Sequence, residues 1–179
     1  MDKVIEILVE MRERGILRDY AIGGATATLF YTEPFATQDV DVFFSVVTKG
    51  IISLAPFYDF LVGEKGFAID KEYIIVGTKP VQFLPATDEL EREALEHAIE
   101  KNYDYYPEGD LRTPRRVHVR IFTPEYLIAI ALKVGRDKDH FKILKLLKQA
   151  QIDGVRLMDI CRRHGLMDKV RKFRETYYA

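Results

Sequence analysis

The hydrophobic and polar positions divide the chain into a mixed front part and a back part that is helical throughout. Apolar residues at helical spacing predict helices over residues 2–14, 25–31 and 88–100. Short runs rich in β-branched and aromatic residues predict strands over residues 19–22, 40–47, 73–76, 81–84 and 117–122. Residues 51–62 are ambiguous and are expected to be helical with a break near Pro56, and residues 102–114 are expected to be a turn-rich connection.

The back part opens with Thr123-Pro124-Glu125, which has an N-cap residue, a proline at the first helical position and an acid in the first turn. Four helices are predicted to follow, over residues 124–134, 137–150, 155–164 and 167–177. We therefore expect an α+β fold divided into two parts, residues 1–122 with the sheet and residues 123–179 as a helical C-terminal subdomain.

Composition narrows the class of protein. A hydrophobic fraction of 47% over 179 residues is typical of an ordered protein with one substantial core. Cys161 is the only cysteine, so an internal disulfide is excluded and a reducing compartment is favoured. No apolar run approaches the roughly 20 residues that span a bilayer, and the early acids argue against a secretory signal. These features predict a cytoplasmic protein with no membrane partner.

The small net charge of −1 conceals a division along the chain. Residues 1–132 carry a net charge of −8, and residues 133–179 carry +7. Two interpretations stay open: the two parts bind different partners, or an acidic face and a basic face simply pack together.

The most informative motif is the pair Gly23-Gly24 followed by Asp39-Val40-Asp41. Alternate side chains of a strand share a face, so Asp39 and Asp41 are expected to point the same way. Glycines let backbone approach a ligand closely, and paired carboxylates suit a divalent cation bound to phosphates. Either half alone is a weak signal, because glycine pairs often form turns and acidic pairs often lie at solvated strand edges. Carboxylates among apolar neighbours are costly to bury without a partner, which favours a metal site over a structural role.

These residues resemble a known signature. The segments Tyr20-Ala-Ile-Gly-Gly-Ala-Thr-Ala and Thr37-Gln-Asp-Val-Asp-Val-Phe are similar to those of the nucleotidyltransferase superfamily, which has the DNA polymerase β-like fold. The resemblance is to small prokaryotic members related to abortive-infection and toxin–antitoxin nucleotidyltransferases. It continues less specifically through Val81-Gln-Phe-Leu-Pro and Pro124-Glu-Tyr-Leu-Ile-Ala, and ends in Gly135-Arg-Asp-Lys-Asp, which is similar to an Arg-x-Lys-Asp element of these proteins.

The resemblance implies a mixed β-sheet with flanking helices and transfer of a nucleotide from a nucleoside triphosphate with Mg²⁺ or Mn²⁺. Asp39 and Asp41 would be the catalytic and metal-binding residues. Gly23 and Gly24 would let backbone amides approach the triphosphate, and Thr26 or Thr28 would add a hydroxyl. Metal ions would polarise the α-phosphate and offset the charge of the leaving pyrophosphate.

The chain departs from this pattern at the third carboxylate. Members that are active usually carry an acid on a neighbouring strand, where this chain offers Gln82, which is neutral and cannot act as a base. Asp70, Glu72 and Asp88 are substitutes by nearness in sequence only. Binding of metal and nucleotide is therefore a firmer prediction than catalysis.

Basic residues of the back part offer further contacts. Lys133, Arg136 and Lys138 are candidates to reach a triphosphate, and Arg136 is favoured because its planar fork suits phosphate. The lysines at positions 138, 142, 145 and 148 share a helix face, which is either a solvated surface or a site for an RNA acceptor such as tRNA. Histidines 97, 118, 140 and 164 show no zinc-ligand spacing with Cys161, which reads as a core residue.

Three hypotheses follow from the sequence. The first is an enzyme that transfers a nucleotide to an unidentified acceptor, either RNA or protein. The second is a non-catalytic relative that binds a nucleotide or a protein partner, such as one half of a toxin–antitoxin pair. The third is an RNA-binding module in which the aspartate pair is structural.

Overall fold

The computed structural model describes residues 1–45, 54–107, 109–110 and 112–178. Its centre is a seven-stranded sheet with the order β3-β4-β5-β2-β1-β7-β6. The strands are β1 (Tyr20–Ile22), β2 (Val40–Phe44), β3 (Ala68–Asp70), β4 (Tyr73–Val76), β5 (Lys79–Pro85), β6 (Ile99–Tyr105) and β7 (Arg115–Ile121). The sheet is mixed, because β2 pairs in parallel with β5 and β1 with β7, while the other neighbours are antiparallel.

The short central strands carry the apolar core. All three residues of β1 are buried, as expected for a strand covered on both faces. Along β2, Val42 is buried on one face, whereas Asp41 on the other is only partly buried. The aromatic rings of β2 serve both faces: Phe43 packs 4.9 Å from Phe122, and Phe44 packs 4.7 Å from Phe57 (ring centroids).

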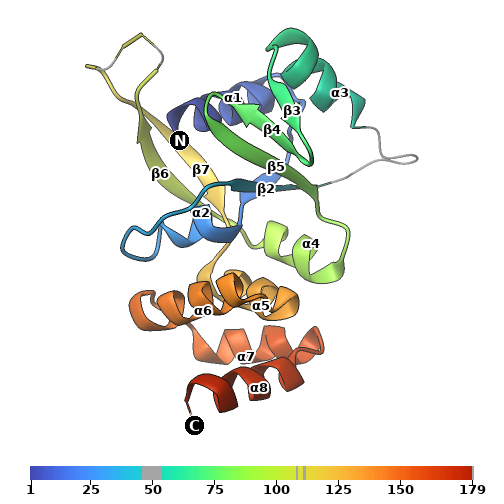
Figure 1. Ribbon diagram of the computed structural model, residues 1–179, viewed down its shortest axis with the longest axis vertical. Coiled ribbons are helices and arrows are strands. Elements are labelled where there is room, and N and C mark those ends of the chain that lie inside the picture. Colours follow the sequence, from blue (N-terminus) through green and yellow to red (C-terminus); the bar gives the residue numbers. More distant parts are fainter. Residues whose placement is uncertain (46–53, 108, 111, 179) are drawn as a thin grey trace.

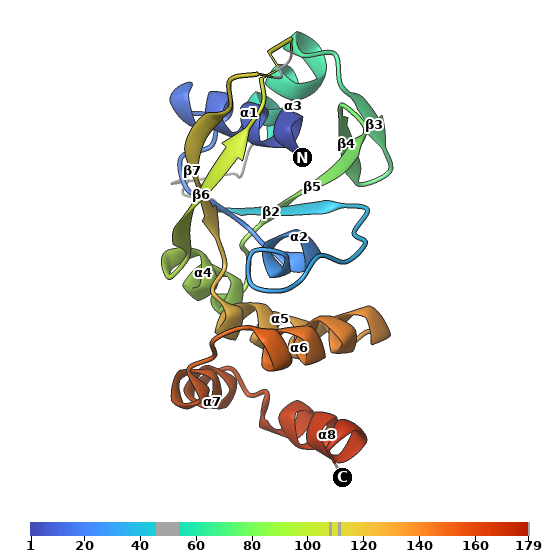
Figure 2. The ribbon, with the colours of Figure 1, turned by 90° about the vertical axis from the view of Figure 1, so that its left-hand side faces the viewer.

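Helices lie on both sides of the sheet. In Figures 1 and 2, α1 (Asp2–Glu13) and α3 (Ala55–Tyr58) lie above β2, whereas α2 (Gly24–Thr28) and α4 (Glu89–Glu96) lie below it. Helix α1 buries one face, made of Val4, Ile5, Ile7, Leu8 and Met11. A π-helical segment, Asp59–Glu64, continues α3.

Four helices are stacked below α2 and α4, as both ribbon views show. They are α5 (Pro124–Val134), α6 (Asp137–Gln149), α7 (Gly154–Arg163) and α8 (Met167–Tyr177). Helix α5 is the most buried of them and contacts α2 and α4 on one side and α6, α7 and α8 on the other. The apolar core therefore continues from the sheet into the helices, and the division of the chain near residue 123 stays a prediction. Among the residues described, no helix is both long and apolar enough to cross a membrane.

Most of the predicted helices and strands are present, but one helix was predicted too long. The predicted helix over residues 88–100 ends at Glu96, and residues from Ile99 onward form β6 instead. This strand pairs with β7 from Ile99↔Ile121 to Tyr105↔Arg115, so a partner distant from the helix decides its structure. The expected connection over 102–114 is therefore partly strand, β3 was not predicted, and residues 46–47 and 51–53 of two predicted elements lie outside the described residues.

The caps show where local sequence signals hold. Asp88 and Glu91 form the capping box that their spacing indicates, with the Glu91 N–H donating to Asp88 Oδ1 at 3.0 Å. Thr123 is the N-cap residue of α5, as predicted, but its buried hydroxyl makes no capping bond. The fixed φ of Pro124 and the packing of α5 therefore define this helix start.

A carboxylate cluster joins α4 to the C-terminal helices. Glu93 of α4 accepts two hydrogen bonds from the Arg163 guanidinium at 2.7 Å each, one from the Tyr126 hydroxyl at 2.7 Å and one from His164 Nε2 at 2.6 Å. The hydrogen bonds from Arg163 and the other donors outweigh burial and lower the pKa of Glu93 to about 2. The cluster therefore fixes α7 against α4 through an ionised carboxylate.

We expect Glu93→Gln to lower the free energy of unfolding by about 1–3 kcal/mol at pH 7, because it leaves Arg163 and His164 without their acceptor charge. Because the pKa of Glu93 is lowered from 4.5 to about 2, its stabilisation is fully present above pH 4.5 and is lost as the pH falls toward 2. Urea unfolding of both proteins between pH 7 and pH 3 measures this. The matched control is Glu96→Gln, an exposed acid of the same helix; an equal loss in both variants would contradict the prediction.

Candidate functional site

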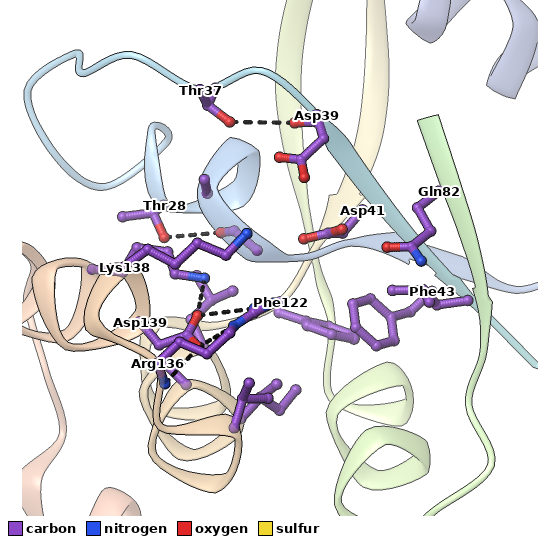
Figure 3. Close-up of a pocket in the computed structure, with 18 of the residues that line it drawn as sticks. Thr28, Thr37, Asp39, Asp41, Phe43, Gln82, Phe122, Arg136, Lys138 and Asp139 are labelled. Atoms are coloured by element: carbon purple, nitrogen blue, oxygen red, sulfur yellow. Dashed lines mark hydrogen bonds and ion pairs between the residues drawn. The ribbon is translucent and has the colours of Figure 1, made fainter. Parts of the chain in front are cut away.

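A pocket of about 690 Å³ lies below β2, between the sheet, α2, α4 and the first turns of α6. It contains Asp39 and Asp41 on one wall, and Arg136, Lys138 and Lys142 on the opposite wall. The two walls come from segments nearly 100 residues apart in the sequence, and Figure 3 shows them facing each other.

The aspartate pair lies at the beginning of β2. Asp39 precedes the strand and Asp41 is its second residue, so both carboxylates are on the pocket face, as predicted. Burial, and secondly the negative charge of Asp39, raise the pKa of Asp41, while Lys142, Lys138 and Arg136 oppose this shift. The two carboxylates are thus crowded and partly desolvated, a condition that a bound cation relieves.

The two glycines have different roles. Gly24 lines the pocket with φ +56, a left-handed conformation, and a Cβ there would overlap the Asp41 carboxylate. Gly23 lies behind the pocket, where a Cβ would come 2.6 Å from the Phe43 ring, and its N–H donates to the Asp41 carbonyl at 2.9 Å. The amide of Gly23 is therefore used within the sheet, and only Gly24 borders the space where a triphosphate would bind.

The threonines of α2 are also engaged inside the protein. Thr26 is buried away from the pocket, and its hydroxyl donates to the Asp39 carbonyl at 3.0 Å. Thr28 does line the pocket, with its hydroxyl donating to the Gly24 carbonyl at 2.9 Å. The structure thus places Thr26, which the resemblance assigned to the nucleotide, as a support for the Asp39 backbone.

A buried acid fixes the cationic wall. Asp139 is 1% exposed and accepts from Arg136 Nε at 2.8 Å, while Lys142 Nζ lies 2.7 Å from its second oxygen. Burial alone would raise the pKa of Asp139, but the hydrogen bonds from Arg136 and Lys142 outweigh it and hold the pKa at about 2. An ionised Asp139 therefore holds these two cations at the pocket rim. Lys142 and Asp139 were not predicted as site residues, although Asp139 ends the Arg-x-Lys-Asp element.

Gln82 occupies the place that the sequence indicated. The parallel register of β2 and β5 pairs Asp41 with Gln82, so the amide lies beside the aspartate on the pocket wall. None of the suggested substitutes lines the pocket: Asp70 ends β3, Glu72 is exposed, and Asp88 caps α4 and pairs with Lys133. Lys133 is accordingly absent from the described lining as well.

The donor set fits a divalent cation in part. Carboxylate oxygens are the ligands that Mg²⁺ prefers, and it commonly takes one or two carboxylates together with phosphate oxygens and water. Across the described ranges, no group of three or more His, Cys, Asp or Glu residues could hold a metal ion by itself. The pair is therefore suited to a cation that arrives with an anionic ligand.

Two residues that sequence reasoning missed also line the pocket. Burial, followed by the charges of Asp39, Glu72 and Asp41, raises the pKa of Tyr73 on β4. Burial and a hydrogen bond with Asp88 raise the pKa of Glu91 on α4. The β4–β5 hairpin pairs Ile74 with Val81, and continuing this register by one residue, which sets Tyr73 opposite Gln82, could have identified Tyr73. Cys161 is buried in the core, as predicted.

Comparisons with known proteins now add to this geometry. No protein-family model matches the chain, and no curated protein shows significant similarity to it. Among solved structures, an antigenic nucleotidyltransferase-like protein from Paracoccidioides brasiliensis matches with a TM-score of 0.56 and 16% identity, over 95% of this chain and 91% of that one. ANT(2″)-Ia, solved in complex with adenylyl-2″-tobramycin, matches with a TM-score of 0.45 and 17% identity, over 97% of both chains.

The first likeness extends over nearly the whole of both chains and has a TM-score above one half, while its identity limits it to a statement about fold. It agrees with the mixed sheet and flanking helices described above. The chain therefore has the nucleotidyltransferase fold.

Proposed function

We propose that this protein binds a nucleoside triphosphate with Mg²⁺ or Mn²⁺ in the pocket below β2 and transfers its nucleotide to an acceptor. The observation that carries the proposal is the opposition of Asp39 and Asp41 to three cationic side chains across one cavity. Cations on one wall suit the phosphates, and carboxylates on the other suit the metal ion that neutralises them.

Each group has a part in this proposal. Asp39 and Asp41 would hold the ion, which would polarise the α-phosphate and offset charge on pyrophosphate. Arg136 and Lys138 would bind the anionic phosphates, with Asp139 keeping the Arg136 fork oriented. Gly24 leaves room for the Asp41 carboxylate at the place where the phosphates would lie.

A second candidate is a nucleotide-binding protein that does not catalyse transfer. Gln82 beside Asp41 favours it, because an amide neither accepts the proton of an acceptor hydroxyl nor adds charge for a second metal ion. Such a protein would act through a partner, as a toxin–antitoxin component does. Relation to the small prokaryotic branch and a cytoplasmic location both stay predictions.

The lysines of α6 give less support to the third hypothesis, an RNA-binding module. Lys142 is engaged with the buried Asp139, and Lys145 lies over the rings of Phe35 and Phe141, so two of the four lysines are turned toward other groups. RNA and protein remain the two candidate acceptors.

We expect Asp41→Asn to weaken binding of ATP in the presence of Mg²⁺ by at least about tenfold, because it removes one of the two charges that would hold the ion. Calorimetric titration with ATP, GTP, CTP and UTP, each with and without Mg²⁺, measures the effect. Asp70→Asn is the matched control, since Asp70 lies outside the pocket. The metal-site proposal would be contradicted if wild type and Asp41→Asn bound ATP with equal affinity, or if wild type bound ATP equally well with and without Mg²⁺.

Gln82→Asp tests whether the chain is an enzyme limited by its missing acid. We expect the variant to release pyrophosphate from ATP at least about tenfold faster than wild type, because a third carboxylate beside Asp41 supplies both a base and a ligand for a second metal ion. A coupled pyrophosphate assay with Mg²⁺ measures the rate, and transfer of label from α-³²P-ATP to protein or RNA identifies the acceptor class. Gln38→Asp, an exposed glutamine at the pocket edge, is the control; no gain in Gln82→Asp would favour the non-catalytic candidate.

A further inference from the structure

The pocket has an aromatic end that the proposed function leaves without a role. Phe141 of α6 is 48% exposed although it lines the pocket, and Phe35, from the loop between α2 and β2, faces it at 5.6 Å with the two rings nearly perpendicular. Val134 of α5, which also lines the pocket, is 49% exposed. Exposed aromatic side chains on a pocket wall mark a place where an apolar ligand surface binds.

We propose that the nucleobase of the bound triphosphate stacks at this aromatic end, on Phe141 with Phe35 as its neighbour. The inference rests on the proposed function. It adds the positions of the base and the phosphates within the pocket. Base-on-aromatic stacking requires an accessible aromatic ring, and Phe141 lines the pocket with nearly half of its surface exposed.

The order of side chains along α6 supports this orientation. Arg136 and Lys138, at the start of the helix, face the aspartate pair, and Phe141 follows Lys138 by about one turn. We place the sugar and base of a triphosphate held between these cations and the aspartates farther along the helix, toward the two rings. Lys142, the third cation of this wall, directly follows Phe141 in α6 and is paired with the buried Asp139.

A lysine completes the aromatic end. Lys145 Nζ lies 5.9 Å from the Phe35 ring centroid and 6.0 Å from that of Phe141, within the range of a cation–π contact. Lys145 is not among the described residues that line the pocket, so this contact supports the rings from outside the lining. Stacking uses no hydrogen bond to a base edge, so we expect it to favour purines over pyrimidines only modestly.

The simpler role for the ring pair is to attach the loop to α6. This loop has a second attachment, because the backbone N–H of Glu33 donates to Gln149 Oε1 at 2.9 Å. The end of the loop at Asp39 is fixed as well, because the hydroxyls of Thr26 and Thr37 both donate to the Asp39 carbonyl. Truncating Phe141 therefore leaves the loop attached at both ends, which separates the two roles experimentally.

The test is calorimetric titration of the full chain with Mg²⁺ and three probes: ATP, UTP and inorganic tripolyphosphate, which lacks a base. We expect wild type to bind ATP more tightly than tripolyphosphate. Phe141→Ala should weaken ATP binding by about tenfold and UTP binding by less, while leaving tripolyphosphate binding unchanged. The half-exposed position of Phe141 makes this variant compatible with folding, and Phe141→Tyr, which keeps the aromatic ring, should restore ATP binding.

Two controls define the contradicting results. Leu147→Ala removes an exposed apolar side chain from the same helix outside the pocket, and Gln149→Ala removes the other loop attachment. The inference is overturned if Phe141→Ala binds ATP as wild type does, if it weakens ATP and tripolyphosphate equally, or if Gln149→Ala reproduces its effect. If the wild-type protein binds neither ATP nor tripolyphosphate, the proposed function itself is contradicted, and the inference that rests on it is contradicted too.

Discussion

The site depends on the close approach of the Gly24 backbone to the Asp41 carboxylate. Antiparallel pairing of β1 with β2 brings the two residues together, and the bond from Gly23 N–H to the Asp41 carbonyl fixes their register. A left-handed residue without a side chain is then required, because any Cβ at position 24 would occupy the space of the carboxylate. The same turn begins α2, whose Thr26 hydroxyl holds the Asp39 carbonyl. One turn of backbone thus orients both acids.

The opposite wall follows from the cost of burying a charge. Asp139 is almost fully enclosed, and an unpaired carboxylate there would be strongly unfavourable. Arg136 and Lys142 compensate it, and in doing so they are held at the pocket rim. Glu93 has the same role at the junction of α4, α5 and α7, where Arg163, Tyr126 and His164 converge on it. Asp139 thus orients two cations at the start of α6, and Glu93 fixes α7 against α4.

The sequence predicts an element well when its signal lies within the element itself, and poorly when a distant segment decides its structure. Helix α1, helices α5 to α8 and strand β2 were predictable, because their hydrophobic spacing is contained within the element itself. Strand β6 was not, since its charged and tyrosine-rich residues have no strong preference until β7 pairs with them. Gly24, Asp39, Asp41 and Gln82 were named correctly as neighbours, because strand alternation and the strand order of the resembled fold place them together. Gly23 and Thr26 were assigned to the nucleotide, but the Gly23 N–H donates to the Asp41 carbonyl and the Thr26 hydroxyl to the Asp39 carbonyl.

The sequence by itself determined the carboxylate pair, the glycine turn beside it and the neutral residue where a third acid is expected, since each follows from spacing along one or two strands. It also determined that the C-terminal part is helical and basic. Only the tertiary structure decided that Arg136, Lys138 and Lys142 face the aspartates, that Asp139 is buried and orients Arg136 and Lys142, and that Phe35 and Phe141 meet in the pocket. The contacts across the pocket join segments that are about a hundred residues apart in the sequence. No local pattern encodes the packing of α5 that brings these segments together.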